Sequence, residues 1–184
     1  PAATLRPETI FGVTNMWVNP TVDYHYAKVN DETWICSEEC IKKLSYQQDS
    51  VQPLKKTITG KDLIGKTCIV PEINREVPIL AGVFADPSVA TGIVMSVPAH
   101  APYDWIALVE SKAPIEAIKI IDVKGFGNNP AKEACDQLGI KSQTETDKLN
   151  EATDLVYKKE FHTGILNEKC GQYAGIKISE IKDT

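Results

Sequence analysis

Short strand-like runs, separated by turn signals at intervals of about ten residues, fill the first half of this 184-residue chain. Most of the runs are rich in β-branched, aromatic and other apolar residues, and glycine, proline, asparagine, aspartate or serine lies between successive runs. They lie at residues 10–18, 24–29, 33–36, 51–58, 67–70, 77–84 and 93–97. Many short strands with regular turns favour a barrel or a strongly curved sheet.

The second half of the chain alternates strand-like runs with helical patterns. Helices are expected after Ser37, from Pro102, from Pro130 to Leu138 and from about Glu145 to Glu160. Further strands are expected at 115–123 and 165–166, followed by a short amphipathic tail. The sequence therefore predicts a mixed α/β fold, with a curved, barrel-like core of several short strands and peripheral helices, in a single domain over residues 1–184.

Composition excludes several classes of protein. An apolar fraction of 42% and a charged fraction of 24% are ordinary for a globular domain. The net charge of −5 argues against a surface that holds long stretches of nucleic acid, although a contact with one nucleotide end remains compatible with it. The five cysteines form no CxxC pair, so no metal site is expected, and reduced thiols favour a cytoplasmic location. No apolar run is long enough for a membrane span.

The stretch from Ala90 to Trp105 combines a strand, a turn and the start of a helix. Its apolar strand is closed by Pro98, and Pro102 suits the first turn of a helix, where the missing N–H costs nothing. The junction therefore holds His100 and Asp104 close together. Such junctions present polar side chains to ligands, which makes Asp104 the first candidate carboxylate.

A second informative segment is the turn Arg6-Pro7-Glu8-Thr9 near the start of the chain. Thr4 and Thr9 lie on either side of this turn. Threonines beside a turn more often favour an extended backbone or form local hydrogen bonds with the backbone than bind a ligand. Taken alone, this segment therefore does not define a site.

Taken together, the two segments support a resemblance to a known family. Thr4 to Gly12 and Thr91 to His100, with Asp104, closely resemble the editing domain inserted in class I aminoacyl-tRNA synthetases of the leucine, isoleucine and valine group. Within that group the chain is most similar to the leucyl-tRNA synthetases of the archaeal and eukaryotic cytosolic branch. The resemblance extends over 140–143 and 157–164, so it covers essentially the whole chain and implies an excised piece of a larger synthetase.

This resemblance implies a proofreading hydrolase. The expected reaction cleaves the ester that joins isoleucine, valine or a similar wrong amino acid to the 3′ terminal adenosine of tRNA(Leu). No cofactor is expected for the editing domain, because ATP serves the synthetic domain, and no metal is required. The implied partners are the mischarged tRNA end and the rest of the parent synthetase.

The resemblance also assigns roles to individual residues. Asp104 matches the aspartate that pairs with the α-ammonium of the misattached amino acid, and Thr9 matches the threonine that rejects leucine. Thr4 is the candidate for contact with water or ribose, and Met95 is a candidate for a neighbouring wall. The residues implied to line the substrate site are Leu5, Arg6, Thr91, Gly92, Met95, Val97, His100 and Tyr103. His100 has two open alternatives, a contact with the terminal nucleotide or a capping or solvated position.

The chain departs from the family pattern at two positions. Ala90 replaces the first glycine of the family's Gly-Thr-Gly, and Leu5 replaces a threonine of bacterial relatives. Two other functions remain open: a non-catalytic module that binds a tRNA acceptor end or a protein, and the editing domain of a valyl or isoleucyl enzyme. Retention of Thr9 and Asp104 favours the hydrolase, and Met95 and Ala101 weigh against the valyl enzyme.

Overall fold

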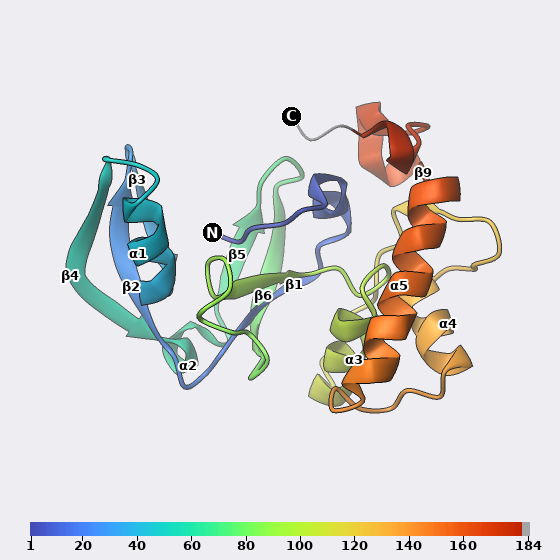
Figure 1. The fold of residues 1–184 in the computed structure, drawn as a ribbon, viewed down its shortest axis with the longest axis horizontal. Coiled ribbons are helices and arrows are strands. Elements are labelled where there is room, and N and C mark those ends of the chain that lie inside the picture. Colours follow the sequence, from blue (N-terminus) through green and yellow to red (C-terminus); the bar gives the residue numbers. More distant parts are fainter. Residues whose placement is uncertain (182–184) are drawn as a thin grey trace. The chain divides into compact units, whose positions relative to one another are not determined.

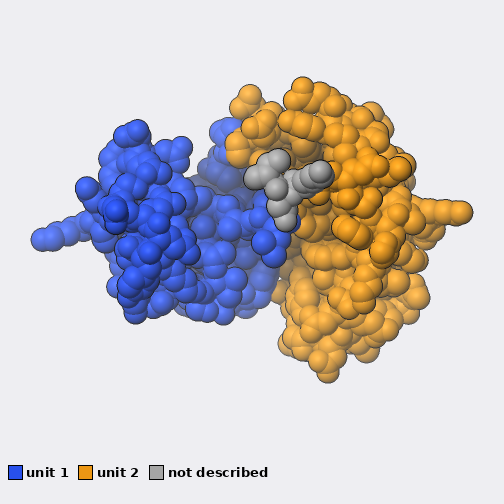
Figure 2. Space-filling model, turned by 45° about the horizontal axis from the view of Figure 1, so that its top comes forward, with its two compact units in different colours: residues 1–5, 15–69, 75–95 blue, residues 6–14, 70–74, 96–184 orange. Residues whose placement is uncertain are grey.

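The computed structural model describes residues 1–181, and their secondary structure is drawn in Figure 1. The chain divides into two units, coloured separately in Figure 2. Unit 1 comprises residues 1–5, 15–69 and 75–95, and unit 2 comprises residues 6–14, 70–74 and 96–184. The single domain over 1–184 stays a prediction, and its residues 182–184 lie outside the described part.

Unit 1 carries most of the strands. They are β1 (Asn15–Val18), β2 (Asp23–Val29), β3 (Glu32–Cys36), β4 (Val51–Thr59), β5 (Thr67–Val70), β6 (Arg75–Ala81) and β7 (Ile93–Ser96), of which β5 and β7 end one residue beyond the unit. Its helices are α1 (Glu38–Ser45) and the short α2 (Gly60–Leu63). Most of these strands match the predicted runs, although β6 ends at Ala81 rather than Phe84.

The strands form separate open sheets. A four-stranded sheet has the order β5-β6-β1-β7, with β1 and β6 parallel and Trp17 opposite Leu80. A three-stranded sheet has the order β3-β2-β4 and is antiparallel, with a bulge between His25 and Ala27. Within residues 1–181 no sheet closes on itself. The mixed α/β class is therefore confirmed, whereas the barrel-like core is not.

The strands β2 and β3 form a hairpin that packs against helix α1, which begins after Ser37 as predicted. Helix α1 begins after Ser37, whose hydroxyl oxygen accepts a hydrogen bond from the Cys40 N–H at 3.1 Å. This is the side-chain cap that satisfies one of the free N–H groups of a helix start. The buried residues of this contact are Ala27, Val29, Cys36, Cys40 and Ile41.

Unit 2 is mainly helical. It contains the 3₁₀ helix η1 (Pro7–Gly12), the helices α3 (Pro102–Ser111), α4 (Pro130–Gln137) and α5 (Thr146–Thr163), the strand pair β8 (Ile121–Asp122) and β9 (Ile165–Leu166), and the 3₁₀ helices η2 (Glu168–Tyr173) and η3 (Ile178–Glu180). Helices α3, α4 and α5 lie side by side in Figure 1. Their shared core consists of Ile106, Ala134, Cys135, Ile140, Leu149, Ala152 and Val156. Leu149, Ala152 and Val156 thus form the apolar face of α5.

Two predicted strands are wrong in part, and both errors bear on the site. Residues 10–18 form a strand only from Asn15, because Pro7 starts a 3₁₀ helix in which the Thr9 N–H donates to the Arg6 carbonyl at 3.0 Å. Residues 115–123 contain only the short β8. Just before it, the Ile120 N–H donates to a histidine ring instead of a neighbouring strand.

The cysteine thiols allow a test of the packing. Burial raises the pKa of Cys36 and Cys135 to about 12, and that of Cys170 to about 11. Because the thiolate is the reactive form, we expect iodoacetamide at about pH 8 to leave these three unmodified in the native protein. Half-exposed Cys68 should be alkylated first. Mass spectrometry of the native and the urea-unfolded protein checks this, and equal labelling of Cys135 in both would contradict it.

Candidate active site

The segment Arg6–Thr9, called here the threonine loop, is shaped by a proline and by a local hydrogen bond. Pro7 occupies the first turn of η1. The Thr9 hydroxyl donates to the Arg6 carbonyl oxygen at 2.7 Å, and the side chain is almost fully buried. This bond fixes the rotamer of Thr9 and engages its hydroxyl proton. Thr9 therefore contributes a rigid shape more than a donor group.

The segment Val97–Asp104, called here the aspartate turn, links β7 to α3. The Val97 N–H donates to Oδ2 of Asp104 at 2.8 Å, and the carbonyl of Val97 accepts from the N–H groups of His100 and Ala101. Asp104 lies in the first turn of α3 and is 6% exposed. A carboxylate is favoured there by the helix dipole. The turn thus holds the direction of the Asp104 carboxylate.

A buried carboxylate on α5 contacts both segments. Oε1 of Glu160 lies 2.6 Å from Nδ1 of His100, and Oε2 lies 2.8 Å from Nη2 of Arg6. Nε2 of His100 accepts a hydrogen bond from the Ile120 N–H at 2.9 Å. Since an acceptor nitrogen carries no proton, this geometry assigns the proton of a neutral imidazole to Nδ1, which donates to Glu160.

The Arg6 guanidinium is enclosed by two acids and an aromatic ring. Its Nε lies 2.9 Å from Glu8, and its Cζ lies 4.5 Å from the centre of the Tyr157 ring. Burial acts to lower the pKa of Arg6, but the carboxylates of Glu160 and Glu8 outweigh it, so the pKa is raised. Arg6 is therefore cationic and is held in place by charge and by the ring.

The Tyr157 phenol lies near enough to Arg6, Asp104 and Glu160 for all three charges to affect its pKa. Burial is the main cause that raises the pKa of the Tyr157 phenol, and the Arg6 cation acts to lower it. The negative charges of Asp104 and Glu160 raise it further. The aspartate turn and the threonine loop thus share one electrostatic neighbourhood.

The predicted site residues fall into both units, which are described separately. Unit 2 holds Arg6, Thr9, Val97, His100, Tyr103 and Asp104, and unit 1 holds Thr4, Leu5, Thr91, Gly92 and Met95. Within unit 2, the Glu160 contacts connect Arg6 and His100, and through them the two segments. Roles in substrate binding for Thr4, Leu5, Thr91, Gly92 and Met95 stay predictions.

Two further predicted residues of unit 2, His100 and Tyr103, have well-defined surroundings, and the role of Tyr103 in substrate binding stays a prediction. His100 is fully buried with both ring nitrogens hydrogen bonded, so the solvated position is wrong and neither nitrogen is available to a nucleotide in this structure. The Tyr103 hydroxyl donates to Oδ1 of Asn150 on α5 at 2.9 Å. Tyr103 therefore packs against α5 through its ring and its hydroxyl.

In unit 1, the loop before β7 has the backbone of a glycine-rich turn. Ala90 has φ +48° and Gly92 has φ +72°. The first value explains why the related family carries glycine where this chain has Ala90. A Cβ at Gly92 would also lie 3.0 Å from the Cβ of Ser37, so this position has no room for a side chain. The Gly92 carbonyl accepts from the Tyr24 hydroxyl at 2.9 Å, and the Thr91 carbonyl accepts from the Ser37 N–H. Leu5 is 96% exposed.

Glu160 and Tyr157 are not among the residues that the sequence predicts for the site. The helix that carries both residues was predicted, but no role was assigned to either side chain. A signal was present, because Glu160 follows Val156 by one helical turn and so continues the buried stripe. A charged residue on a core-facing stripe needs a partner, and Arg6 and His100 are far away in sequence.

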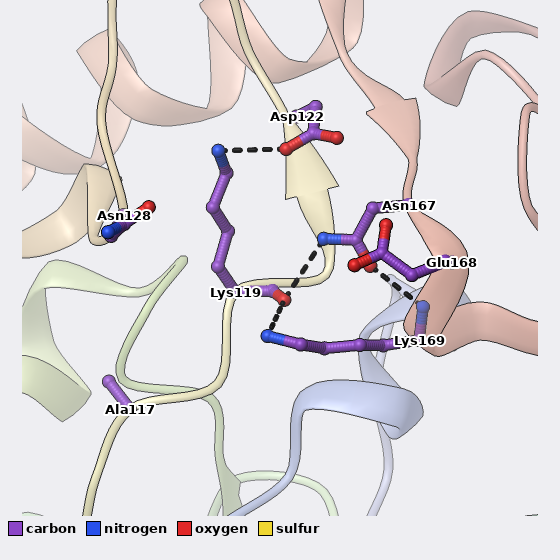
Figure 3. A pocket seen from close by; sticks show the side chains of 7 residues that line it. All are labelled: Ala117, Lys119, Asp122, Asn128, Asn167, Glu168 and Lys169. Carbon is purple, nitrogen blue, oxygen red and sulfur yellow. Dashed lines mark hydrogen bonds and ion pairs between the residues drawn. The ribbon is translucent and has the colours of Figure 1, made fainter.

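A polar hollow elsewhere in unit 2 is a second place to consider, and Figure 3 shows it from close by. It measures about 420 Å³ and is lined by Ala117, Lys119, Asp122, Asn128, Asn167, Glu168 and Lys169. The Lys119 ammonium pairs with Asp122 at 2.8 Å, and that of Lys169 donates to the Lys119 carbonyl at 3.2 Å. Its lining charges balance and its two cations are engaged, so it offers no strong site for a charged ligand.

In residues 1–181, no helix is long and apolar enough to span a membrane. In the same range, no group of three or more histidine, cysteine, aspartate or glutamate side chains is arranged to bind a metal ion.

Comparisons with known proteins agree on one family. Residues 2–163 match the family model for "Leucyl-tRNA synthetase, editing domain". The leucine–tRNA ligase of Methanocaldococcus jannaschii is 48% identical over 198 aligned residues, which cover 100% of this chain and 21% of that protein. The chain thus spans about a fifth of the length of such relatives.

Solved structures give the same result. The crystal structure of GlLeuRS-CP1 superposes with a TM-score of 0.83 at 28% identity, covering 97% of this chain and 74% of the other. The cytosolic leucyl-tRNA synthetase editing domain of P. falciparum superposes with a TM-score of 0.79 at 22% identity, covering 97% and 71%, which supports the fold alone. The predicted resemblance is confirmed, and the chain belongs to the family of leucyl-tRNA synthetase editing domains.

Proposed function

We propose that this chain is the editing domain of a larger leucine–tRNA ligase and hydrolyses tRNA(Leu) that carries isoleucine, valine or a similar amino acid. The observation that carries the proposal is that the threonine loop and the aspartate turn, the two segments most like the family's editing site, both contact the buried Glu160. A shared buried anchor is what a site assembled from distant segments needs.

The chemistry of the substrate fits Asp104. An aminoacyl ester carries an α-ammonium whatever its side chain, so one well-oriented carboxylate positions every such substrate in the same way. Asp104 supplies this group, since its carboxylate is almost buried and is held by the Val97 N–H. Excluding water from the site strengthens such a charge pair, because the effective dielectric constant falls.

The ester itself demands little from the protein. It is activated already, so positioning a water molecule and stabilising the developing oxyanion are sufficient. Neither a nucleophilic serine nor a metal ion is required for this step. The discrimination is harder, because one methylene or branch point is worth only about 1–3 kcal/mol in an apolar pocket. A second site that rejects leucine by shape answers that need, and rigid Thr9 is the candidate for the rejecting group.

A deacylation assay tests the proposal. The full-length synthetase that carries this domain should release isoleucine from isoleucyl-tRNA(Leu) and leave leucyl-tRNA(Leu) largely intact. The rival is a non-catalytic module that binds only a tRNA acceptor end or a protein. If the full-length enzyme released no isoleucine while still binding the tRNA, that rival would replace the hydrolase.

Replacing Thr9 with alanine should relax the rejection of leucine. We expect hydrolysis of leucyl-tRNA(Leu) to rise about 10- to 200-fold, because the substitution removes the branched side chain that fills the space of the γ-branch. The assay follows release of radiolabelled leucine. Thr163→Ala is the matched control, because its exposed hydroxyl also donates to a backbone carbonyl. Continued protection of leucyl-tRNA(Leu) in the Thr9 variant would assign the rejection to another residue.

A further inference from the structure

Glu160 differs from most acids of the chain because its side chain is fully buried. It also connects the threonine loop to the aspartate turn, because one of its oxygens contacts Arg6 and the other contacts His100. A buried carboxylate is costly unless it is paired and hydrogen bonded, and here Oε1 hydrogen bonds with His100 while Oε2 forms an ion pair with Arg6. The free-energy cost of burying the Glu160 carboxylate indicates that the connection between the two segments has a role.

On the threonine side, the path from Glu160 to Thr9 is short. Glu160 holds the Arg6 guanidinium, and Glu8 and the ring of Tyr157 hold it from other directions. The carbonyl oxygen of the same Arg6 accepts the bonds from the Thr9 hydroxyl and the Thr9 N–H. A shift of Arg6 would therefore move the acceptor that fixes the Thr9 rotamer.

On the aspartate side, the path runs through His100. Its ring is fixed between Glu160 and the Ile120 N–H. Its backbone N–H donates to the Val97 carbonyl, and the Val97 N–H donates to Asp104. Glu160 is thus a shared reference point for both functional side chains.

We infer that Glu160 is a positioning residue for amino acid selection, an inference that rests on the editing function proposed above. With the substrate ammonium anchored at Asp104, rejection of leucine depends on where the rigid side chain of Thr9 stands relative to that anchor. Glu160 sets this relation without touching the substrate. Its loss therefore changes which amino acid is removed more than how fast an ester is cleaved.

The change Glu160→Gln separates the two sides of the connection. Nδ1 of His100 is a donor, so the carbonyl oxygen of the new amide faces His100 and keeps that bond. The NH₂ group of the amide then faces the Arg6 guanidinium, donor against donor. The threonine loop therefore loses its ion pair with Glu160 and keeps only the Glu8 and Tyr157 contacts of Arg6, whereas the aspartate turn keeps its bond to residue 160.

Helix α5 offers a matched control. Asp154 pairs with Lys158 at 2.9 Å, and both side chains are about 70% exposed. Asp154→Asn makes the same carboxylate-to-amide change on the same helix. Exposed pairs of this kind contribute little to stability, so this variant reports any general effect of losing a charge.

The experiment uses the full-length synthetase in five forms: wild type, Glu160→Gln, Asp154→Asn, Thr9→Ala and the Thr9→Ala/Glu160→Gln double variant. Hydrolysis of isoleucyl-tRNA(Leu) and of leucyl-tRNA(Leu) is measured for each. We expect Glu160→Gln to raise leucyl-tRNA(Leu) hydrolysis about tenfold or more and to leave isoleucyl-tRNA(Leu) hydrolysis within about threefold. Asp154→Asn should match wild type. In the Thr9→Ala background, Glu160→Gln should add nothing, because both act through the same side chain.

Each contrary outcome has a distinct meaning. An equal fall in hydrolysis of both substrates by Glu160→Gln would show a purely structural role and overturn the inference, as would continued protection of leucyl-tRNA(Leu). Additive effects in the double variant would also overturn it, because Glu160 would then act independently of Thr9. Failure of wild type on isoleucyl-tRNA(Leu) would instead reject the proposed function itself.

Discussion

Replacing Asp104 with asparagine should lower the rate of isoleucyl-tRNA(Leu) hydrolysis by about 30- to 5,000-fold. This range corresponds to about 2–5 kcal/mol, the usual cost of removing one partner of a desolvated charge pair. The asparagine side chain keeps an oxygen that can accept the Val97 N–H, so this bond of the turn is retained while the negative charge is lost. Alanine would remove this acceptor too and leave a backbone N–H unpaired, at a further cost of about 1–3 kcal/mol in stability.

The control for this variant is Asp122→Asn. Asp122 is also paired with a local group, the Lys119 ammonium, but it lies on the polar hollow of Figure 3. We expect this change to leave hydrolysis unaltered. Near-normal hydrolysis by Asp104→Asn would remove Asp104 from the mechanism. A large loss of hydrolysis in Asp122→Asn would indicate that the polar hollow takes part in the reaction.

Replacing Arg6 with methionine should lower the free energy of unfolding by about 3–5 kcal/mol. The reason is that Glu160 would remain fully buried without its cationic partner. The remaining bond from His100 should keep the loss toward the lower end of this range. Urea unfolding followed by circular dichroism measures the change.

Two further variants identify the cause of that loss. Lys158→Met breaks the exposed pair with Asp154 and should cost at most about 0.5 kcal/mol. The double variant Arg6→Met/Glu160→Gln removes the buried charge with its partner, so it should recover part of the lost stability. A loss in Arg6→Met no larger than that in Lys158→Met would mean that the Arg6–Glu160 pair is not a structural anchor.

The local structure that the sequence predicts best is set by neighbouring residues. Ser37 caps α1, and Asn129 caps α4 through the Lys132 N–H. The hairpin of β2 and β3 turns at Asn30, whose φ of +52° suits asparagine. In these elements the signal and the structure lie within a few residues of each other.

The errors occur where distant residues decide the structure. The segment before β8 is rich in isoleucine, but the Ile120 N–H bonds to His100 rather than to a strand. Closure of a barrel depends on pairing between distant strands, which composition does not encode. The described strands form open sheets, so the barrel-like core stays unconfirmed.

The candidate site shows the same division. Asp104 could be singled out at a strand-to-helix junction, whereas Thr9 was assigned only through the family resemblance of the two segments together. Glu160 could not be assigned a role, because its meaning depends on Arg6 and His100, and these are brought to it only by the tertiary fold. The sequence shows only that Glu160 continues the apolar stripe of its helix, and this position does not identify the residues that pair with it.

The most direct test of the account is a structure with a stable analogue of isoleucyl-adenosine, in which an amide replaces the ester. The account predicts that the α-ammonium of the analogue lies within about 3.2 Å of an Asp104 carboxylate oxygen. It also predicts that the isoleucine side chain contacts Thr9. An analogue bound with its ammonium away from Asp104, or bound in the hollow beside Lys119, would contradict the account.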